Sequence, residues 1–417
     1  MPDLDVVLFG PTGVTGREVA RYLGRRAPSL GLRWGVAGRD RDRIDAVLAD
    51  VGASPDEVLL ADVNEPTSIE AMASAARVVA NLVGPYAQFG EPVYAACAAA
   101  GTHQLDLTGE VDWVKAMIGR YDEEATDSGA KIVPTAGYEA LPFDLATLLA
   151  AQSLHERTLD PVVEVDIAVS ITSGVQVSSA ADLVSGGTFT SGVAGMRRGL
   201  GDSATDAYYL DPPTSRARGR YDLRPRKHPV TGQWVSPMFP TPFLNPPVIH
   251  RSAALLRDSD DGIFAADFRY REGSVADTSI PSQAQPVAAV VLSLLTAGMG
   301  SSTKLPPGVR EPLADKLLQV GPKAGEGPRP DDLDDWSYRL DVRATDVRGA
   351  TQDVVVEADG HPGYKSTATM IGEAACALAD TMSGVPDGAG FLTPATALGL
   401  ASIDRMAEAG VRFHVLS

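Results

Sequence analysis

The sequence predicts an α/β protein in which a doubly wound parallel sheet carries an inserted α+β domain with a largely antiparallel sheet. Three observations support this prediction. The first 150 residues alternate apolar runs with helical stretches, a glycine-rich turn follows the first run, and residues 151–360 contain polar–apolar alternation of period two. Alternating strands and helices are typical of parallel βαβ units, whereas period-two alternation is typical of strands with one solvated face.

Residues 1–150 are expected to form the doubly wound domain. Asp5–Phe9 is a short apolar run that ends at a glycine, which is typical of a buried parallel strand. Similar runs predict further strands at Leu32–Ala37, Val58–Ala61, Val78–Val83, His103–Leu107 and Lys131–Thr135. Helices are expected between the strands, at Gly13–Arg25, Arg41–Val51, Pro66–Ala76, Pro92–Ala100 and Val111–Ser128.

Residues 151–360 are expected to form the inserted domain, after a helix over Asp144–His155. Alternation predicts its strands at Glu164–Ile171, Phe264–Tyr270 and Tyr338–Ala344. Glycine and proline are frequent in Gly199–Pro247 and Pro306–Pro330, so long loops are expected there. Residues 361–417 are expected to pack back on the first domain as helices over Lys365–Leu400, interrupted by a turn at Val385–Gly388.

The longest apolar run is Val287–Ala297, which Ser293 and Thr296 interrupt. It is shorter than the roughly 20 residues that span a bilayer, so no transmembrane segment is expected. We expect a core helix here. A helix that faces lipid, and so gives peripheral membrane contact, is the alternative.

Composition indicates a soluble cytoplasmic protein. The net charge of −18 disfavours nucleic acid and anionic membranes unless a local basic patch intervenes. Cys97 and Cys376 lie in alanine-rich stretches outside any CxxC pair, which predicts buried thiols in a reducing compartment and no metal site. The N-terminus lacks the basic start and apolar run of a signal peptide.

The turn after the first strand has the sequence Gly10-Pro-Thr-Gly13-Val-Thr-Gly16. In Rossmann-type domains, the first glycine of such a turn permits a tight bend, the second lets a pyrophosphate approach the backbone, and the third lets the helix pack closely. The pyrophosphate lies at the helix N-terminus, where free N–H groups favour an anion. Thr12, Val14 and Thr15 stand between the glycines, and the two threonine hydroxyls are further donors. A turn without a ligand is the alternative.

The end of the second strand indicates which dinucleotide is bound. NAD-binding domains place an acidic residue there, on the ribose 2′-hydroxyl. This chain has Gly38 followed by Arg39, which leaves room for a 2′-phosphate and supplies a cation for it. NADPH is therefore predicted. The alternative is that Arg39 is a surface residue and Asp40 binds the ribose.

Further cofactor contacts are expected where other strands end, because ligands of open α/β sheets lie at the carboxyl ends of the strands. Asp62 and Val63 follow the third strand and are expected near the adenine. Leu82, Val83 and Gly84 follow the fourth and are expected beside the nicotinamide ribose.

Several motifs together resemble the saccharopine dehydrogenase-like oxidoreductases, and most of all their trans-acting enoyl reductases of lipid and polyketide assembly. The motifs are Gly10–Gly16, Asn81–Tyr86, Asp106–Glu110, Gly137–Asp144, His361–Tyr364, Ala374–Cys376 and Gly390–Pro394. They lie in the first 145 residues or so and the last 60 or so, and the middle of the chain matches no motif. The resemblance implies NADPH-dependent reduction of a C=C bond conjugated to a thioester, on a chain held by a synthase or carrier.

Hydride transfer belongs to the cofactor, so the protein must orient the substrate and supply a proton. Tyr86 is the first candidate donor because its loop is expected to reach the nicotinamide, and Tyr138 is the second. Packing against the cofactor is the alternative role for Tyr86. Asp106 and Glu110 either hold the site or, in the case of Glu110, cap a helix. His103 is expected to be structural.

The basic run Ser215–His228 is interpreted as a solvated loop, and a surface that docks an acidic carrier protein is the alternative. Three functions remain open: an enoyl reductase acting on an acyl or polyketide substrate, an imine or amino-acid reductase of the saccharopine type, and a non-catalytic NADPH-binding protein of lipid assembly. Paired arginines beside the nicotinamide would favour the second, and a long apolar groove the first. The oligomeric state is left open.

Overall fold

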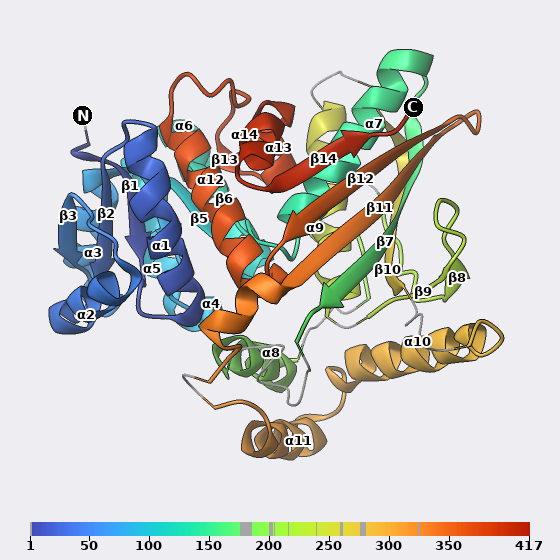
Figure 1. Ribbon diagram of the computed structural model, residues 1–417, viewed down its shortest axis with the longest axis horizontal. Helices are drawn as coiled ribbons and strands as arrows, with labels where there is room; N and C mark the ends of the chain where they lie inside the picture. Colours follow the sequence, from blue (N-terminus) through green and yellow to red (C-terminus); the bar gives the residue numbers. More distant parts are fainter. Residues whose placement is uncertain are drawn as a thin grey trace.

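The computed structural model describes residues 2–175, 186–199, 203, 205–215, 217–238, 240–258, 262–275, 281–323 and 326–417. Figure 1 shows two sheets side by side: the first holds the N-terminal strands, and the second contains the long strands β7 (Val162–Ser173), β11 (Trp336–Asp346) and β12 (Thr351–Asp359). The predicted fold class is confirmed: one sheet is parallel throughout, and the other is largely antiparallel.

The first sheet has the strand order β13-β6-β5-β4-β1-β2-β3. After β1, the chain builds β2 and β3 on one side and then returns to place β4 on the other side of β1. This reversal leaves a crevice at the carboxyl ends of β1 and β4, which is where ligands bind in such sheets. The strands are β1 (Leu4–Phe9), β2 (Trp34–Gly38), β3 (Glu57–Leu60), β4 (Ala76–Asn81), β5 (His103–Asp106), β6 (Lys131–Val133) and β13 (Gly390–Phe391).

Helices cover both faces of this sheet. One face is covered by α1 together with α12, which packs on α1 and on the central strands β1, β4 and β5. On the other face, α3 and α5 pack together and α6 packs on α5, around a core that includes Val7, Val79 and Cys97. The helices are α1 (Val14–Ser29), α2 (Arg41–Val51), α3 (Pro66–Ala75), α4 (Tyr86–Phe89), α5 (Glu91–Ala100), α6 (Val111–Ser128) and α12 (Thr367–Ala379). Cys97 and Cys376 are buried free thiols, as predicted.

The second sheet has the order β14-β12-β11-β7-β10-β9-β8, and within it only the pair β7–β10 is parallel in the described residues. Val165, Ile167, Leu340 and Val342 lie on the face that packs against α7 (Leu141–Thr158). The strands are β7 (Val162–Ser173), β8 (Arg226–Lys227), β9 (Trp234–Ser236), β10 (Phe264–Val275), β11 (Trp336–Asp346), β12 (Thr351–Asp359) and β14 (Val411–Val415).

The remaining helices join or flank the two sheets. They are α8 (Gly186–Arg198), α9 (Asn245–Asp258), α10 (Gln285–Ser302), α11 (Pro307–Val320), α13 (Pro394–Leu398), α14 (Ile403–Glu408), a π-helical turn at Pro362–Ser366, and 3₁₀ turns at Thr241–Phe243, Pro330–Asp335 and Leu400–Ser402. The C-terminal part of the chain contributes one strand to each sheet, since β13 pairs with β6 and β14 pairs with β12. The division of the chain at residues 150 and 360 stays a prediction.

Four expectations about single elements were wrong, of which three concern predicted loops and helices and the fourth concerns α10. The predicted loop Pro306–Pro330 contains α11, because Pro307 occupies the first helical turn, where its missing N–H costs nothing. The predicted loop Gly199–Pro247 contains β8 and β9, which are too short to show alternation. The predicted helical segment Lys365–Leu400 is helical only in part, since α12 ends at Ala379 and β13 follows.

The apolar run Val287–Ala297 forms part of α10, as a helix was expected there, but the expectation that this helix lies in the core was wrong. Most of its large side chains are exposed, namely Val287, Val290, Val291, Leu294 and Leu295, and only 22% of α10 is buried. By length and composition, α10 is the one helix among the described residues that could cross a membrane.

Candidate active site

The turn after β1 is shaped by two glycines. Gly10 has a φ of +92°, which glycine adopts without strain, and its N–H donates to the Ala37 carbonyl oxygen at 3.0 Å. A Cβ on Gly16 would lie 2.2 Å from the Gly10 carbonyl oxygen, so only glycine lets α1 approach the turn this closely. The turn and the helix are therefore packed directly against each other.

Gly13 lies at the start of α1 and differs from its two neighbours. A Cβ there would meet nothing nearer than the Gly10 carbonyl oxygen at 4.0 Å, so the fold itself does not require glycine at this position. No side chain caps the helix, and Thr12 beside it is exposed. The first N–H groups of α1 thus face open space, which fits an incoming diphosphate. Val14 and Thr15 are half-buried in the same turn.

Arg39 follows β2 directly, and its side chain is exposed. Its guanidinium makes no ion pair or hydrogen bond within the described part of the chain. Asp40, the alternative ligand for the ribose, instead caps α2 by accepting a hydrogen bond from the Arg43 N–H at 3.1 Å. At the end of β2, the Arg39 guanidinium is therefore free to bind a ligand, whereas the Asp40 carboxylate is already used to cap α2.

The loop after β4 contacts the glycine turn. A Cβ on Gly10 would lie 2.8 Å from Val83 Cγ2, and the Leu82 N–H donates to the Phe9 carbonyl oxygen at 2.8 Å. Gly84 follows in the same loop. These contacts bring the two loops together at the reversal point of the sheet.

Asp62 and Val63 lie farther along the same edge, after β3. One Asp62 carboxylate oxygen accepts from the backbone and side-chain N–H groups of Asn64 at 2.9 and 2.8 Å, so the aspartate closes a turn of its own. Val63 is half-buried against the core.

Tyr86 is buried at the start of α4, and its hydroxyl has two backbone partners. It donates to the Asn81 carbonyl oxygen at 3.1 Å and accepts from the Leu107 N–H at 3.2 Å. Burial, with Asp106 adding to it, raises the pKa of Tyr86 well above its usual value. The hydroxyl thus ties the end of β4 to the loop after β5.

Glu110 also holds this loop in place. Its carboxylate does not cap α6, whose first residue it precedes. It accepts instead from the Tyr86 and Ala87 N–H groups, at 2.9 and 3.3 Å, and it forms an ion pair with Arg198 of α8. A carboxylate at these N–H groups stabilises the start of α4.

Asp106 is fully buried at the end of β5. Its carboxylate accepts from the Tyr94 hydroxyl at 2.5 Å and from the Thr108 N–H at 2.9 Å. Burial raises its pKa. His103 at the start of the same strand accepts from the Lys131 N–H, which agrees with the structural role expected of it.

Tyr138 follows β6, where the two sheets meet. Its ring packs edge to face on Tyr338 of β11 at a centroid distance of 4.8 Å, and also on Phe143. The residue is 8% exposed, and its hydroxyl makes no hydrogen bond with any described residue. Burial, followed by Tyr338 and Glu272, raises its pKa well above the usual value, so the hydroxyl keeps its proton.

Two acids near Tyr138 were not predicted as site residues. Oε2 of Glu139 and Oε1 of Glu272 are buried without a hydrogen-bond partner among the described residues, and burial raises the pKa of both carboxyls. Glu272 shares the apolar face of β10 with Phe268 and Tyr270, and it accepts from Tyr270 and Asn245. The sequence held a signal for Glu272: the alternation of Phe268 and Tyr270 places this acid on the apolar side of the strand, where a carboxyl is unusual.

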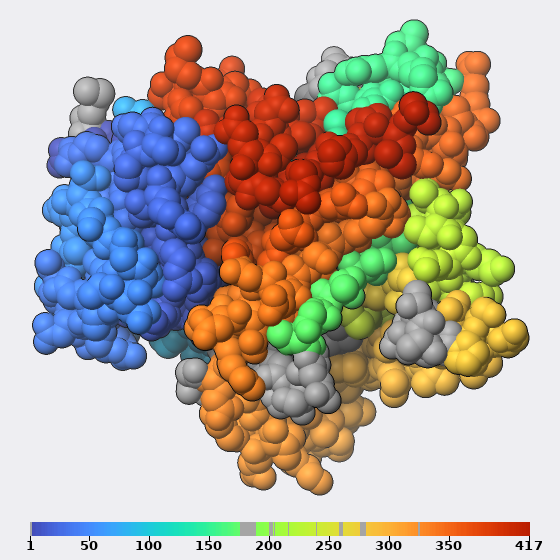
Figure 2. All heavy atoms as spheres, viewed as in Figure 1, coloured from blue at the N-terminus to red at the C-terminus, as the bar shows by residue number. Residues whose placement is uncertain are grey.

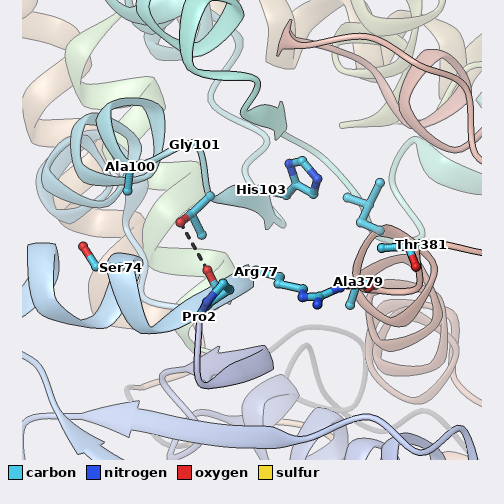
Figure 3. Close-up of a pocket in the computed structure, with 11 residues that line it drawn as sticks. Pro2, Ser74, Arg77, Ala100, Gly101, His103, Ala379 and Thr381 are labelled. Atoms are coloured by element: carbon cyan, nitrogen blue, oxygen red, sulfur yellow. Dashed lines mark hydrogen bonds between the residues drawn. The ribbon is translucent and has the colours of Figure 1, made fainter.

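A separate hollow of about 280 Å³ lies at the opposite end of the strands (Figure 3). It is lined by residues at the starts of β4 and β5, including Ala76, Arg77 and His103. There the Thr102 hydroxyl donates to the Ala76 carbonyl oxygen at 3.2 Å. This hollow is therefore distinct from the edge that holds Gly13 and Arg39.

The basic run Ser215–His228 is paired in part within the chain. Arg226 binds the buried Asp166, Arg224 binds Asp222, and Arg218 lies 3.8 Å from Asp206. Arg216 lies outside the described residues. Arg220 and Lys227 are exposed and have no side-chain partner within the described ranges, so both the solvated loop and the carrier-docking surface stay predictions.

Comparison with known proteins identifies the family. Residues 6–133 match the saccharopine dehydrogenase NADP-binding domain. A relative from Mycobacterium tuberculosis is 32% identical over 98% of this chain and 96% of its own length. A trans-acting enoyl reductase of Mycobacterium ulcerans is 31% identical over 98% of this chain and 97% of its own length.

The fold has a solved counterpart. Saccharopine dehydrogenase (L-Glu forming) from Saccharomyces cerevisiae is superposable with a TM-score of 0.57 over 99% of both chains, at 11% identity. The NADP-binding match also fits the free amides of α1 and the free Arg39. The chain therefore belongs to the saccharopine dehydrogenase-like oxidoreductases and is an NADPH-dependent enzyme.

Proposed function

We propose that the chain reduces a C=C bond conjugated to a thioester carbonyl, on an acyl or polyketide intermediate. The unpartnered hydroxyl of Tyr138, at the junction of the two sheets, is the observation that carries this proposal. The name of the relatives, trans-acting enoyl reductase, supports the same substrate class.

The proposed chemistry needs one proton from the protein. NADPH supplies the hydride, which adds to the β-carbon of the enoyl group. Negative charge then spreads onto the thioester oxygen, and the α-carbon takes a proton. In our proposal Tyr138 Oη donates that proton and regains one from solvent. Its raised pKa keeps it protonated until the negative charge develops.

Tyr86 is the other candidate donor, and we propose a positioning role for it. Its hydroxyl already donates to the Asn81 carbonyl oxygen and accepts from the Leu107 N–H. To donate to a substrate it would have to leave a buried carbonyl without a partner, which costs about 1–3 kcal/mol.

The charges near Tyr138 disfavour small dicarboxylates as substrates. Arg269 and Arg271 lie on the solvent side of β10 and contact Glu164, and Arg339 of β11 lies on the same side of the sheet and binds Asp341. The side that faces Tyr138 carries Glu272 instead. A dicarboxylate would need cations where the described residues place carboxyls, so we favour the thioester over the saccharopine-type imine.

NADPH consumption by the purified chain tests this proposal. We expect turnover with enoyl thioesters and little with imines or keto acids. Turnover with imines alone would make the enzyme a saccharopine-type reductase. NADPH binding without turnover on any of the three would favour the non-catalytic function. Carrier-bound and free thioesters compared in the same assay would show whether a carrier contributes.

A further inference from the structure

A helix on the surface of a soluble protein usually turns its apolar side chains towards the core, but α10 (Gln285–Ser302) turns them outward. Its buried side chains are small or polar: Ala289, Ser293, Thr296 and Gly300. Its large apolar side chains point outward, with exposed fractions between 45 and 68%: Val287, Val290, Val291, Leu294, Leu295 and Met299. Their spacing places them on one side of the helix, opposite the buried residues.

Specific contacts fix this orientation. The Ser236 hydroxyl of β9 bonds the Ser293 hydroxyl at 2.9 Å, and the Thr296 hydroxyl donates to the Pro237 carbonyl oxygen at 3.0 Å. A Cβ on Gly300 would lie 2.4 Å from the Phe243 ring, so only glycine fits there. Turning the helix to bury its leucines would break these contacts, so the outward apolar face is built into the fold.

The next helix, α11, also carries exposed apolar side chains, which are Val309, Leu313 and Val320. Arg310 joins the neighbouring elements: it donates to the Thr303 and Leu305 carbonyl oxygens after α10 and to the Arg197 and Arg198 carbonyl oxygens of α8. Both helices lie along the lower margin of the molecule in Figures 1 and 2. We call the exposed apolar residues of α10 and α11 the apolar margin.

The charge around the apolar margin differs from that of the whole chain. Residues 281–323 carry four basic and two acidic side chains, in a chain that has 36 basic and 54 acidic ones. The helix α10 itself has no charged residue. Lys304 just after it and Lys316 on α11 are exposed, and neither side chain has a partner within the described ranges.

From these observations we propose that the apolar margin docks on the surface of an anionic lipid layer. The leucines and valines of α10 would enter the outer acyl region while the helix stays parallel to the surface, and Lys304 and Lys316 would meet the headgroups. Charges act over about a Debye length, roughly 8–10 Å, so these local cations act at the contact although the chain is acidic. The proposal is independent of the reaction assigned to the enzyme.

A second copy of the chain is the less favoured occupant. The stripe on α10 is one helix face, whereas a stable dimer buries about 800 Å² on each partner. Two copies meeting here would place Lys304 and Lys316 of both copies close together, with Glu311 as the one carboxylate of residues 281–323 outside an ion pair, since Asp315 of α11 binds Arg197.

Cosedimentation of the purified full chain with vesicles tests the proposal. The probes are vesicles of phosphatidylcholine alone and of phosphatidylcholine mixed with phosphatidylglycerol. We expect binding to the mixed vesicles and weaker binding to the neutral ones. The variant L294E/L295E should lose roughly tenfold or more of this affinity, because two exposed apolar side chains that would enter the lipid become charged. K304Q/K316Q should remove the preference for the anionic lipid.

The matched control is V347E/M382E, which adds the same two charges at exposed apolar positions outside the apolar margin. It should bind mixed vesicles like the wild type, and NADPH binding should be unchanged in every variant, which shows that they fold. The proposal is overturned if the wild type does not sediment with mixed vesicles, or if L294E/L295E and the control behave alike. It is also overturned if L294E/L295E only splits a dimer in sedimentation equilibrium.

Discussion

Tyr138 and Tyr338 pack edge to face with their ring centroids 4.8 Å apart. The first follows β6 of the parallel sheet, and the second belongs to β11 of the antiparallel sheet. This contact places Tyr138 where the parallel sheet, which carries the NADP-binding motifs, meets the antiparallel sheet, whose sequence matched no motif. The hydroxyl of Tyr138 is therefore the side-chain group at this junction that we assign to proton transfer.

The two tyrosines near the site should respond differently to loss of the hydroxyl. Tyr138→Phe should lower kcat with an enoyl thioester by roughly a hundredfold or more, because a positioned proton donor is worth about that much. NADPH affinity and stability should stay near the wild-type values, since no hydrogen bond of the described residues is lost. Steady-state kinetics and urea unfolding measure both quantities.

Tyr86→Phe is the matched comparison. It leaves the Asn81 carbonyl oxygen and the Leu107 N–H without their partner, so the free energy of unfolding should fall by about 1–3 kcal/mol. Its kcat should fall less than that of Tyr138→Phe. If Tyr86→Phe stopped turnover while Tyr138→Phe kept it, the two roles would be exchanged.

Gly13 and Gly16 lie one helical turn apart, and alanine at the two positions should have different effects on NADPH affinity and on stability. Gly13→Ala adds a Cβ into open space at a φ of −75°, so stability should change by no more than about 0.5 kcal/mol. NADPH affinity should still fall about tenfold or more, because the Cβ stands where the diphosphate approaches the backbone. Equal NADPH affinity in Gly13→Ala and the wild type would place the diphosphate elsewhere.

Gly16→Ala should damage the fold itself. Its Cβ would lie 2.2 Å from the Gly10 carbonyl oxygen, so either α1 or the turn must move. We expect a loss of about 3–5 kcal/mol in the free energy of unfolding, measured by urea denaturation. A variant as stable as the wild type would show that the contact relaxes easily.

Asp144 should make stability depend on pH. Burial raises its pKa from 3.8 to about 7 in the folded chain, although its carboxylate accepts from the Ala395 N–H at 2.8 Å. Between pH 4 and 7 the folded state thus holds a proton that the unfolded state releases. Stability from this group is complete below pH 4 and is lost as the pH rises towards 7.

Asp144→Asn tests this dependence. Asparagine keeps an acceptor for the Ala395 N–H but does not titrate, so the free energy of unfolding should fall less steeply between pH 4 and 7 than in the wild type. The slope is measured by urea unfolding at several pH values. An identical slope in both proteins would assign the effect to another group.

Much of the first sheet could be predicted because its strands are buried on both faces and appear as continuous apolar runs. The predicted strand Val78–Val83 overlaps β4, and the predicted strand His103–Leu107 contains β5. The strand β13 could not be predicted, since Gly390–Phe391 is too short to form a pattern and pairs with β6 across most of the chain. The exposed face of α10 was also missed, because apolarity in a sequence does not show which side is buried.

The features of the site that depend on backbone conformation could be predicted from the sequence. The positive φ of Gly10 and the close packing of Gly16 follow from the glycine spacing. The partners of side chains do not follow from spacing. Tyr86 and Tyr138 are similar as sequence candidates, and only tertiary contacts distinguish the bonded hydroxyl from the unpartnered one.

Calorimetric titration of the wild type and Arg39→Ala with NADPH and NADH tests the central claim most directly. Arg33→Ala is the control, since that residue precedes the same strand at its other end. We predict that Arg39→Ala weakens NADPH binding by about 1.5–3 kcal/mol, the usual contribution of a charged hydrogen bond, and hardly changes NADH binding. Equal losses for both dinucleotides, or a folded wild type that binds neither, would contradict the assignment of this edge as the NADPH site.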